Sequence, residues 1–266
     1  MKNLIIGIMG SVFSLGVPVE GETSTPVDLP NKENFYLVLL AGQSNMAGRG
    51  IIEEPEKLPN PRVLALGEDG KWRLAVAPIH FDKKVAGVGL ASSFAEEIAE
   101  KYPNVTIGLI PAACGGSGIS TWKPGGYHSQ TKSHPWDDAI ARARVAMNNG
   151  VLKGILWHQG ESDGKPGLAE SYEGNLQDLF QRFRTEFNAP ELPIVLGQLG
   201  QFPAKPWDKY REQVNAAHIA VSTRMEKVAF VTSDGLTPNS DIVHFDTRSL
   251  RIFGKRYAEA YLKLVD

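Results

Sequence analysis

The stretch Phe35-Tyr36-Leu37-Val38-Leu39-Leu40-Ala41-Gly42-Gln43-Ser44-Asn45-Met46 decides how this chain folds. Its first part, residues 35–41, is an unbroken apolar run that stops at a glycine. Such a run, bounded by a turn, is typical of a β-strand that is buried on both faces in a parallel sheet. Ser44 then lies just beyond the carboxyl end of a core strand, where open α/β sheets bind their ligands. A serine in this position is either a helix cap or a nucleophile, and the stretch alone leaves both possibilities open.

Apolar, strand-like runs alternate with helical patterns along the rest of the chain. We expect strands at residues 35–41, 105–111, 154–157, 193–199 and 228–232, and helices at residues 90–102, 136–148, 168–187, 210–225 and 250–264. Two shorter runs, 62–66 and 72–76, flank a Glu-Asp-Gly turn and predict an inserted hairpin. The alternation predicts an α/β fold with a five-stranded, mainly parallel sheet between two layers of helices, a three-layer α/β/α sandwich.

The N-terminus predicts export from the cytoplasm. A short basic start, Met1-Lys2-Asn3, precedes a mostly apolar segment at residues 4–17, which matches a secretory signal peptide. We place cleavage between Gly16 and Thr25, with an uncleaved anchor as the alternative. Residues 1–25 are thus a signal peptide and leader, and residues 26–266 are a single domain of a secreted or periplasmic protein. We expect no membrane span after removal of the signal peptide.

Composition gives weaker indications about partners. The formal net charge of -2 does not suggest a nucleic-acid partner. Cys114 is the single cysteine, so the chain cannot form an internal disulfide.

Three of the expected strands end in polar turns, and a fourth polar motif follows near the C-terminus. The motifs are Gly-Gln-Ser-Asn-Met at 42–46, Gly-Gly-Ser at 115–117, Trp-His-Gln-Gly-Glu-Ser-Asp at 157–163 and Asp-Ile-Val-His-Phe-Asp at 241–246. Because the carboxyl ends of parallel strands share one edge of a sheet, we expect the turns to converge.

The residue types in these motifs suit acyl transfer. A serine hydroxyl becomes an effective nucleophile when a histidine takes its proton, and a carboxylate that orients the imidazole assists this step. Asp241 and His244 are three residues apart, so that a tight turn can bring the carboxylate to the ring of His244. The amides of Ser44 and Gly116 and the side chain of Gln159 are candidate donors to an oxyanion.

Together the four motifs resemble the SGNH hydrolase superfamily, and they are most similar to its branch of carbohydrate esterase family 6 and sialate O-acetylesterases. The resemblance extends from about residue 35 to the end of the chain and implies a flavodoxin-like α/β/α fold. It also implies Ser44 as nucleophile, His244 as base and Asp241 as the orienting acid. The implied oxyanion hole consists of Ser44, Gly116 and Gln159. Glu161, within the third motif, is the rival for the role of the acid.

The resemblance further implies an acetylated carbohydrate as substrate, with acetylxylan or xylo-oligosaccharides as the first choice and O-acetyl sialic acid as the second. Trp122 could stack on a sugar face or pin its own loop, and Arg49 could meet an acidic sugar or remain a solvated surface residue. We expect no metal or other cofactor, since no second histidine at metal-ligand spacing accompanies His158. A lipase or arylesterase of the same superfamily and an inactive carbohydrate-binding relative are the alternative functions.

Overall fold

One sheet of seven strands forms the centre of the protein in the computed structural model, which describes residues 27–266. The expected signal peptide and leader, residues 1–25, lie outside the described residues. The strands are β1 (Phe35–Gly42), β2 (Val63–Leu66), β3 (Trp72–Leu74), β4 (Thr106–Pro111), β5 (Val151–His158), β6 (Ile194–Gly197) and β7 (Val228–Val231). The α-helices are α1 (Ser44–Ala47), α2 (Ala91–Lys101), α3 (Pro135–Met147), α4 (Ala169–Glu186), α5 (Lys209–Arg224) and α6 (Thr247–Val265), and short 3-10 helices cover Lys32–Asn34, Glu54–Lys57 and Ile119–Thr121.

The expected strand at the nucleophile motif is the middle strand of the sheet. The strand order is β3-β2-β4-β1-β5-β6-β7, and every pairing is parallel except that of β2 with β3. β1 pairs with β4 on one side and with β5 on the other. The mainly parallel sheet and the burial of β1 on both faces are therefore as predicted.

The number of strands differs from the prediction of five. The hairpin that we treated as an insertion belongs to the same sheet, because β2 pairs in parallel with β4 through Val63 and Ile107. All four residues of β2 are buried, whereas Arg73 and Leu74 of β3 are exposed at the edge of the sheet. The sequence did not predict that these strands pair with the main sheet, because a strand of four residues is too short for its periodicity to indicate a distant partner.

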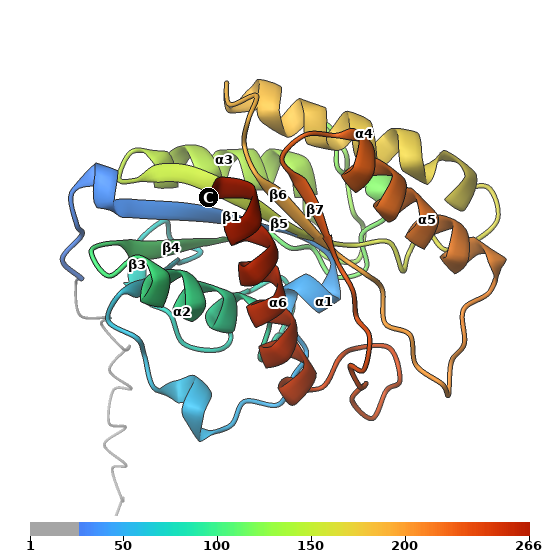
Figure 1. Cartoon of the computed structure of the whole chain (residues 1–266), viewed down its shortest axis with the longest axis horizontal. Helices are drawn as coiled ribbons and strands as arrows, with labels where there is room; N and C mark the ends of the chain where they lie inside the picture. The colour runs from blue at the N-terminus through green and yellow to red at the C-terminus, as the bar shows by residue number, and fades with distance from the viewer. Residues whose placement is uncertain (1–26) are drawn as a thin grey trace, which may run out of the picture.

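Helices cover both faces of the sheet, as Figure 1 shows, with α2 and α6 on one face and α3, α4 and α5 on the other. Leu37, Leu39 and Ala41 of β1 belong to the core beneath α3, α4 and α5, while Val38 and Leu40 belong to the core beneath α2 and α6. This division explains the unbroken apolar run, since a central strand must present apolar side chains to two cores. Within residues 27–266, none of the helices is both long enough and apolar enough to cross a bilayer.

Candidate active site

Ser44 lies at the point where β1 ends and the single turn of α1 begins. The amide of Gln43 donates to the carbonyl of His158 at 2.8 Å, which ties this turn to the end of β5. Gly42 has φ +132°, and a Cβ atom at this position would lie 2.1 Å from the carbonyl oxygen of His158. Glycine is therefore required for the close approach of the two strand ends that positions Ser44.

The structure brings together the three residues expected to form a triad. Ser44 Oγ lies 2.8 Å from Nε2 of His244, although 200 residues separate them in the chain. Nδ1 of the same ring lies 2.6 Å from Oδ2 of Asp241. Since the carboxylate accepts a hydrogen bond from the N–H at Nδ1, Nε2 is left as the acceptor that a serine hydroxyl needs.

Asp241 is held in place by its own turn. Its Oδ1 accepts the backbone amides of Val243 at 2.8 Å and His244 at 2.9 Å, which leaves Oδ2 for the ring. Partial burial alone would raise the pKa of the Asp241 carboxyl, but the hydrogen bonds from the side chain and backbone of His244 and from Val243 lower it below its usual value. The group is thus a carboxylate under the conditions in which a neutral histidine can act as a base.

Glu161, the rival acid, has different partners. Its Oε1 accepts a hydrogen bond from Nδ2 of Asn45 at 2.6 Å and lies 3.7 Å from Nε2 of the buried His158. Burial would raise the pKa of Glu161, but the neighbouring His158 and the hydrogen bond from Asn45 lower it to about 2. The geometry at the ring of His244 therefore favours Asp241 as the orienting acid.

Asn45 connects Glu161 to the loop that carries the histidine. Its Nδ2 also reaches the carbonyl of Val243 at 3.4 Å, and its Oδ1 accepts the amide of Phe245 at 3.2 Å. These two contacts hold the residues on either side of His244. The sequence did not reveal this role, because hydrogen bonds between positions about 200 residues apart leave no local pattern.

Two backbone amides are available as oxyanion donors. Within residues 27–266, neither the amide of Ser44 nor that of Gly116 donates to another protein group, whereas the amide of Gly115 donates to Oδ2 of Asp82 at 2.9 Å. Gly116 has φ +88°, and a Cβ there would lie 2.8 Å from Oε1 of Gln130. Of the two glycines, Gly116 is therefore the one that can offer its amide to a substrate.

Gln159 does not lie in the open position expected of an oxyanion donor. It is fully buried, and its Nε2 donates to Oδ2 of Asp163 at 2.5 Å, to the carbonyl of Ser117 at 3.1 Å and to Oε1 of Gln43 at 3.2 Å. An amide nitrogen carries two hydrogens, so these three acceptors already use both. The hydroxyl of Tyr172 lies 2.9 Å from Oε1 of Gln159, and this contact completes a closed internal network.

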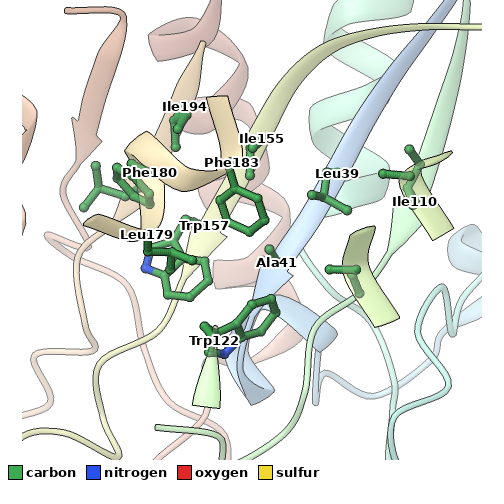
Figure 2. Packing of buried hydrophobic residues seen from close by; sticks show 14 of the residues in the cluster. Leu39, Ala41, Ile110, Trp122, Ile155, Trp157, Leu179, Phe180, Phe183 and Ile194 are labelled. Atoms are coloured by element: carbon green, nitrogen blue, oxygen red, sulfur yellow. The ribbon is translucent and has the colours of Figure 1, made fainter. Parts of the chain in front are cut away.

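Neither residue considered for sugar binding is placed to do so. Trp122 is only 1% exposed, packs edge-on against Trp157 at 5.0 Å between ring centroids and donates from Nε1 to Ser117 Oγ at 3.0 Å. Figure 2 shows both rings within the hydrophobic cluster. The side chain of Arg49 is 7% exposed and forms an ion pair of 2.9 Å with Asp82. These two sequence-based expectations are corrected: Trp122 is a core residue that pins its loop, and the guanidinium of Arg49 is already neutralised.

Comparison with known proteins found a matching family and related structures. Residues 34–263 match the family model described as carbohydrate esterase, sialic acid-specific acetylesterase. A protein of Arabidopsis thaliana named as a probable carbohydrate esterase is 32% identical over 263 residues, which are 91% of this chain and 95% of the relative. An X-ray structure of an Arabidopsis thaliana protein, also 32% identical, superimposes with a TM-score of 0.76 over 87% of this chain and 98% of its own.

More distant structures share the fold. A carbohydrate acetylesterase from Xanthomonas citri is 19% identical, with a TM-score of 0.68 over 87% of this chain and 56% of its own. A GDSL-like lipase from Parabacteroides merdae is 15% identical, with a TM-score of 0.56 over 89% of this chain and 99% of its own.

Proposed function

Because the chain belongs to the carbohydrate esterase family described as sialic acid-specific acetylesterases, we propose that it is a serine esterase that removes O-acetyl groups from carbohydrates. The observation that carries this proposal is the chain of short contacts from Ser44 Oγ through the ring of His244 to Asp241, at 2.8 and 2.6 Å. This arrangement supplies a nucleophile, a base and an orienting carboxylate within hydrogen-bond distance.

In the proposed reaction, Ser44 Oγ attacks the carbonyl carbon of the acetyl group while its proton passes to Nε2 of His244. The carbonyl oxygen becomes an oxyanion that the amides of Ser44 and Gly116 stabilise. When the tetrahedral intermediate collapses, His244 protonates the departing sugar oxygen and Ser44 remains acetylated. Water, deprotonated by His244, then attacks the acetyl-serine, and the products are acetate and free Ser44.

We propose a neutral acetylated sugar, such as acetylated xylan or its oligosaccharides, as the first substrate choice. The ion pair between Arg49 and Asp82 supports this choice, because the guanidinium that we considered for binding the carboxylate of an acidic sugar is already paired with Asp82. O-acetyl sialic acid is the second choice, which the description of the family supports.

The direct test measures ester hydrolysis by the wild type and by Ser44→Ala. The substrates are acetylated xylan, an O-acetyl sialic acid, 4-nitrophenyl acetate and 4-nitrophenyl octanoate. We expect the wild type to release acetate from xylan faster than from sialic acid, and Ser44→Ala to release none. Release of octanoate faster than acetate would favour the lipase alternative. A wild type that hydrolyses none of these esters, or a Ser44→Ala variant with unchanged activity, would refute the proposal.

We also propose that the enzyme acts outside the cytoplasm, on the basis of the basic start and the apolar segment at residues 4–17. Cell fractionation followed by N-terminal sequencing tests this. Recovery of the full-length chain from the cytoplasm alone would contradict it.

A further inference from the structure

The carboxamide of Gln43 lies between the turn of Ser44 and the motif that follows β5. Its Oε1 accepts three hydrogen bonds, from Nε2 of Gln159 at 3.2 Å and from the amides of Gly160 and Ser162 at 3.4 Å each. Backbone amides can only donate, so the oxygen of the Gln43 carboxamide must face them. The orientation of the carboxamide is therefore set by its surroundings, and its nitrogen points away from these donors.

The nitrogen of this carboxamide has no partner of its own. Within residues 27–266, Nε2 of Gln43 donates no hydrogen bond, although the residue is only 4% exposed. Nε2 of Gln43 is not one of the fully buried side-chain atoms that lack a partner, so it is accessible to solvent and open to a ligand. Gln43 directly precedes Ser44, so this donor is carried by the same turn as the proposed nucleophile.

The same loops also hold the other proposed donors. The hydroxyl of Ser162, whose amide donates to Gln43, donates in turn to the carbonyl of Gly116 at 3.0 Å. Gln43 is thereby connected to both residues whose backbone amides are available, to Ser44 through the chain and to Gly116 through Ser162. The carboxamide of Gln159, in contrast, lies behind that of Gln43 and has no free hydrogen.

We propose that Nε2 of Gln43 is the side-chain donor to the oxyanion, and that Gln159 is a positioning residue that acts through Gln43. As the Ser44 Oγ–carbon bond forms, the carbonyl electron pair moves onto oxygen, and the Gln43 amide stabilises that charge together with the amides of Ser44 and Gly116. The hydrogen bond from Gln159 fixes the Gln43 oxygen and polarises the amide, which makes its N–H groups better donors. This inference rests on the serine-esterase chemistry proposed above.

The test compares steady-state kinetics of four variants on 4-nitrophenyl acetate, a small ester that removes sugar recognition from the measurement. Gln43→Met deletes the donor, and Gln43→Glu deletes the donor but keeps an oxygen for the three hydrogen bonds. Gln159→Met deletes the supporting amide. Gln198→Met is the matched control, because Gln198 is also a buried glutamine after a strand, with its oxygen bound to the amide of Ser233 at 2.8 Å.

We expect both Gln43 variants to lose about 10²–10³-fold in kcat with little change in KM, which is the usual effect of removing one oxyanion donor. The decrease in kcat should be smaller for Gln159→Met than for the Gln43 variants. Gln198→Met should be less stable than the wild type but keep its kcat. Methylboronic acid, which forms a tetrahedral anion on Ser44, should bind Gln43→Met more weakly by a factor similar to the loss in kcat. A purely structural role would not produce this parallel between boronate affinity and kcat.

The outcomes separate this inference from the proposed function. If the wild type fails to hydrolyse 4-nitrophenyl acetate, the proposed function itself fails. If the wild type is active and Gln43→Met keeps its kcat and its boronate affinity, only the role of Gln43 is refuted. If kcat falls more in Gln159→Met than in Gln43→Met, Gln159 and not Gln43 is the side-chain donor to the oxyanion. If Gln43→Met does not fold, the same measurements on Gln43→Glu decide the question.

Discussion

The side-chain amide of Asn45 donates a 2.6 Å hydrogen bond to Oε1 of Glu161, which lies 116 residues further along the chain. The same side chain contacts the carbonyl of Val243 and the amide of Phe245, on either side of His244. The residue after Ser44 therefore connects three segments of the site: the turn after β1, the motif after β5 and the histidine loop. We therefore expect the geometry of the Ser44–His244 contact to depend on this connection.

Asn45→Ala should lower kcat on 4-nitrophenyl acetate by about 10²-fold, because a displacement of roughly 1 Å in a catalytic group is sufficient for such a loss. KM should stay near the wild-type value, since Asn45 binds protein groups only. Asn175→Ala is the control, because Asn175 is an exposed residue of α4 whose amide reaches Ser171. Unchanged kcat in a folded Asn45→Ala variant would contradict the connecting role.

Glu161 should contribute stability only while it is ionised. Its pKa is lowered from 4.5 to about 2 in the folded protein, so that its contribution is complete above pH 4.5 and is lost as the pH falls towards 2. In urea titrations across this range, the free energy of unfolding of the wild type should fall more steeply with decreasing pH than that of Glu161→Gln. Equal slopes for the two proteins, at equal m-values, would show that the ionised carboxylate does not stabilise the fold.

Asp241→Asn should lower kcat by up to about 10⁴-fold, the loss known for the same change in a serine protease triad. An amide facing Nδ1 favours the tautomer with its proton on Nε2, and that tautomer cannot accept the proton of Ser44. Asp246→Asn provides the comparison, since Asp246 caps α6 by accepting the amide of Ser249 at 2.7 Å and lies two residues beyond the histidine. It should keep most of its activity, and an equal loss in both variants would argue against a specific role of Asp241.

Trp122→Ala should act on stability and not on substrate binding. Removing a fully buried tryptophan costs about 3–5 kcal/mol, measured as the change in free energy of unfolding. Tyr127→Ala, in the same loop but 53% exposed, should have little effect on the free energy of unfolding. A rise in KM for acetylated xylan in a folded Trp122→Ala variant, without loss of stability, would restore the sugar-stacking role.

Gly116→Ala should reduce both stability and kcat. The left-handed backbone at φ +88° costs an alanine about 1–2 kcal/mol, and its Cβ would also meet Gln130 at 2.8 Å. Gly235→Ala also places an alanine in left-handed backbone, at φ +72°, but no atom lies within 4 Å of its new Cβ. It should therefore lose stability only, and full kcat in Gly116→Ala would contradict the expectation that a Cβ at residue 116 displaces its backbone amide.

Local patterns in the sequence were sufficient to predict the core of the fold. The apolar run of residues 35–41 required two buried faces, and β1 has them because it lies between β4 and β5. The five long helices begin and end within a few residues of their expected positions. The hairpin at residues 62–76 was also predicted, but its place in the sheet was not, since pairing with β4 is a long-range contact that four residues cannot specify.

The sequence alone predicted Ser44 and His244 as the reacting groups, because they lie in motifs whose residue types and spacing suit acyl transfer, but it left Asp241 and Glu161 as rivals for the orienting acid. Only the tertiary structure decided which groups remain free to act. Trp122 and Arg49 have suitable chemistry for a sugar, but one is in the core and the other is paired with Asp82. The amide of Gln159 is used inside the protein, while that of Gln43 is left open. The physical reason is that a side chain can bind a substrate only if it is exposed and its hydrogen-bonding groups are unpaired. Both conditions depend on residues that are distant in the sequence and that folding brings into contact.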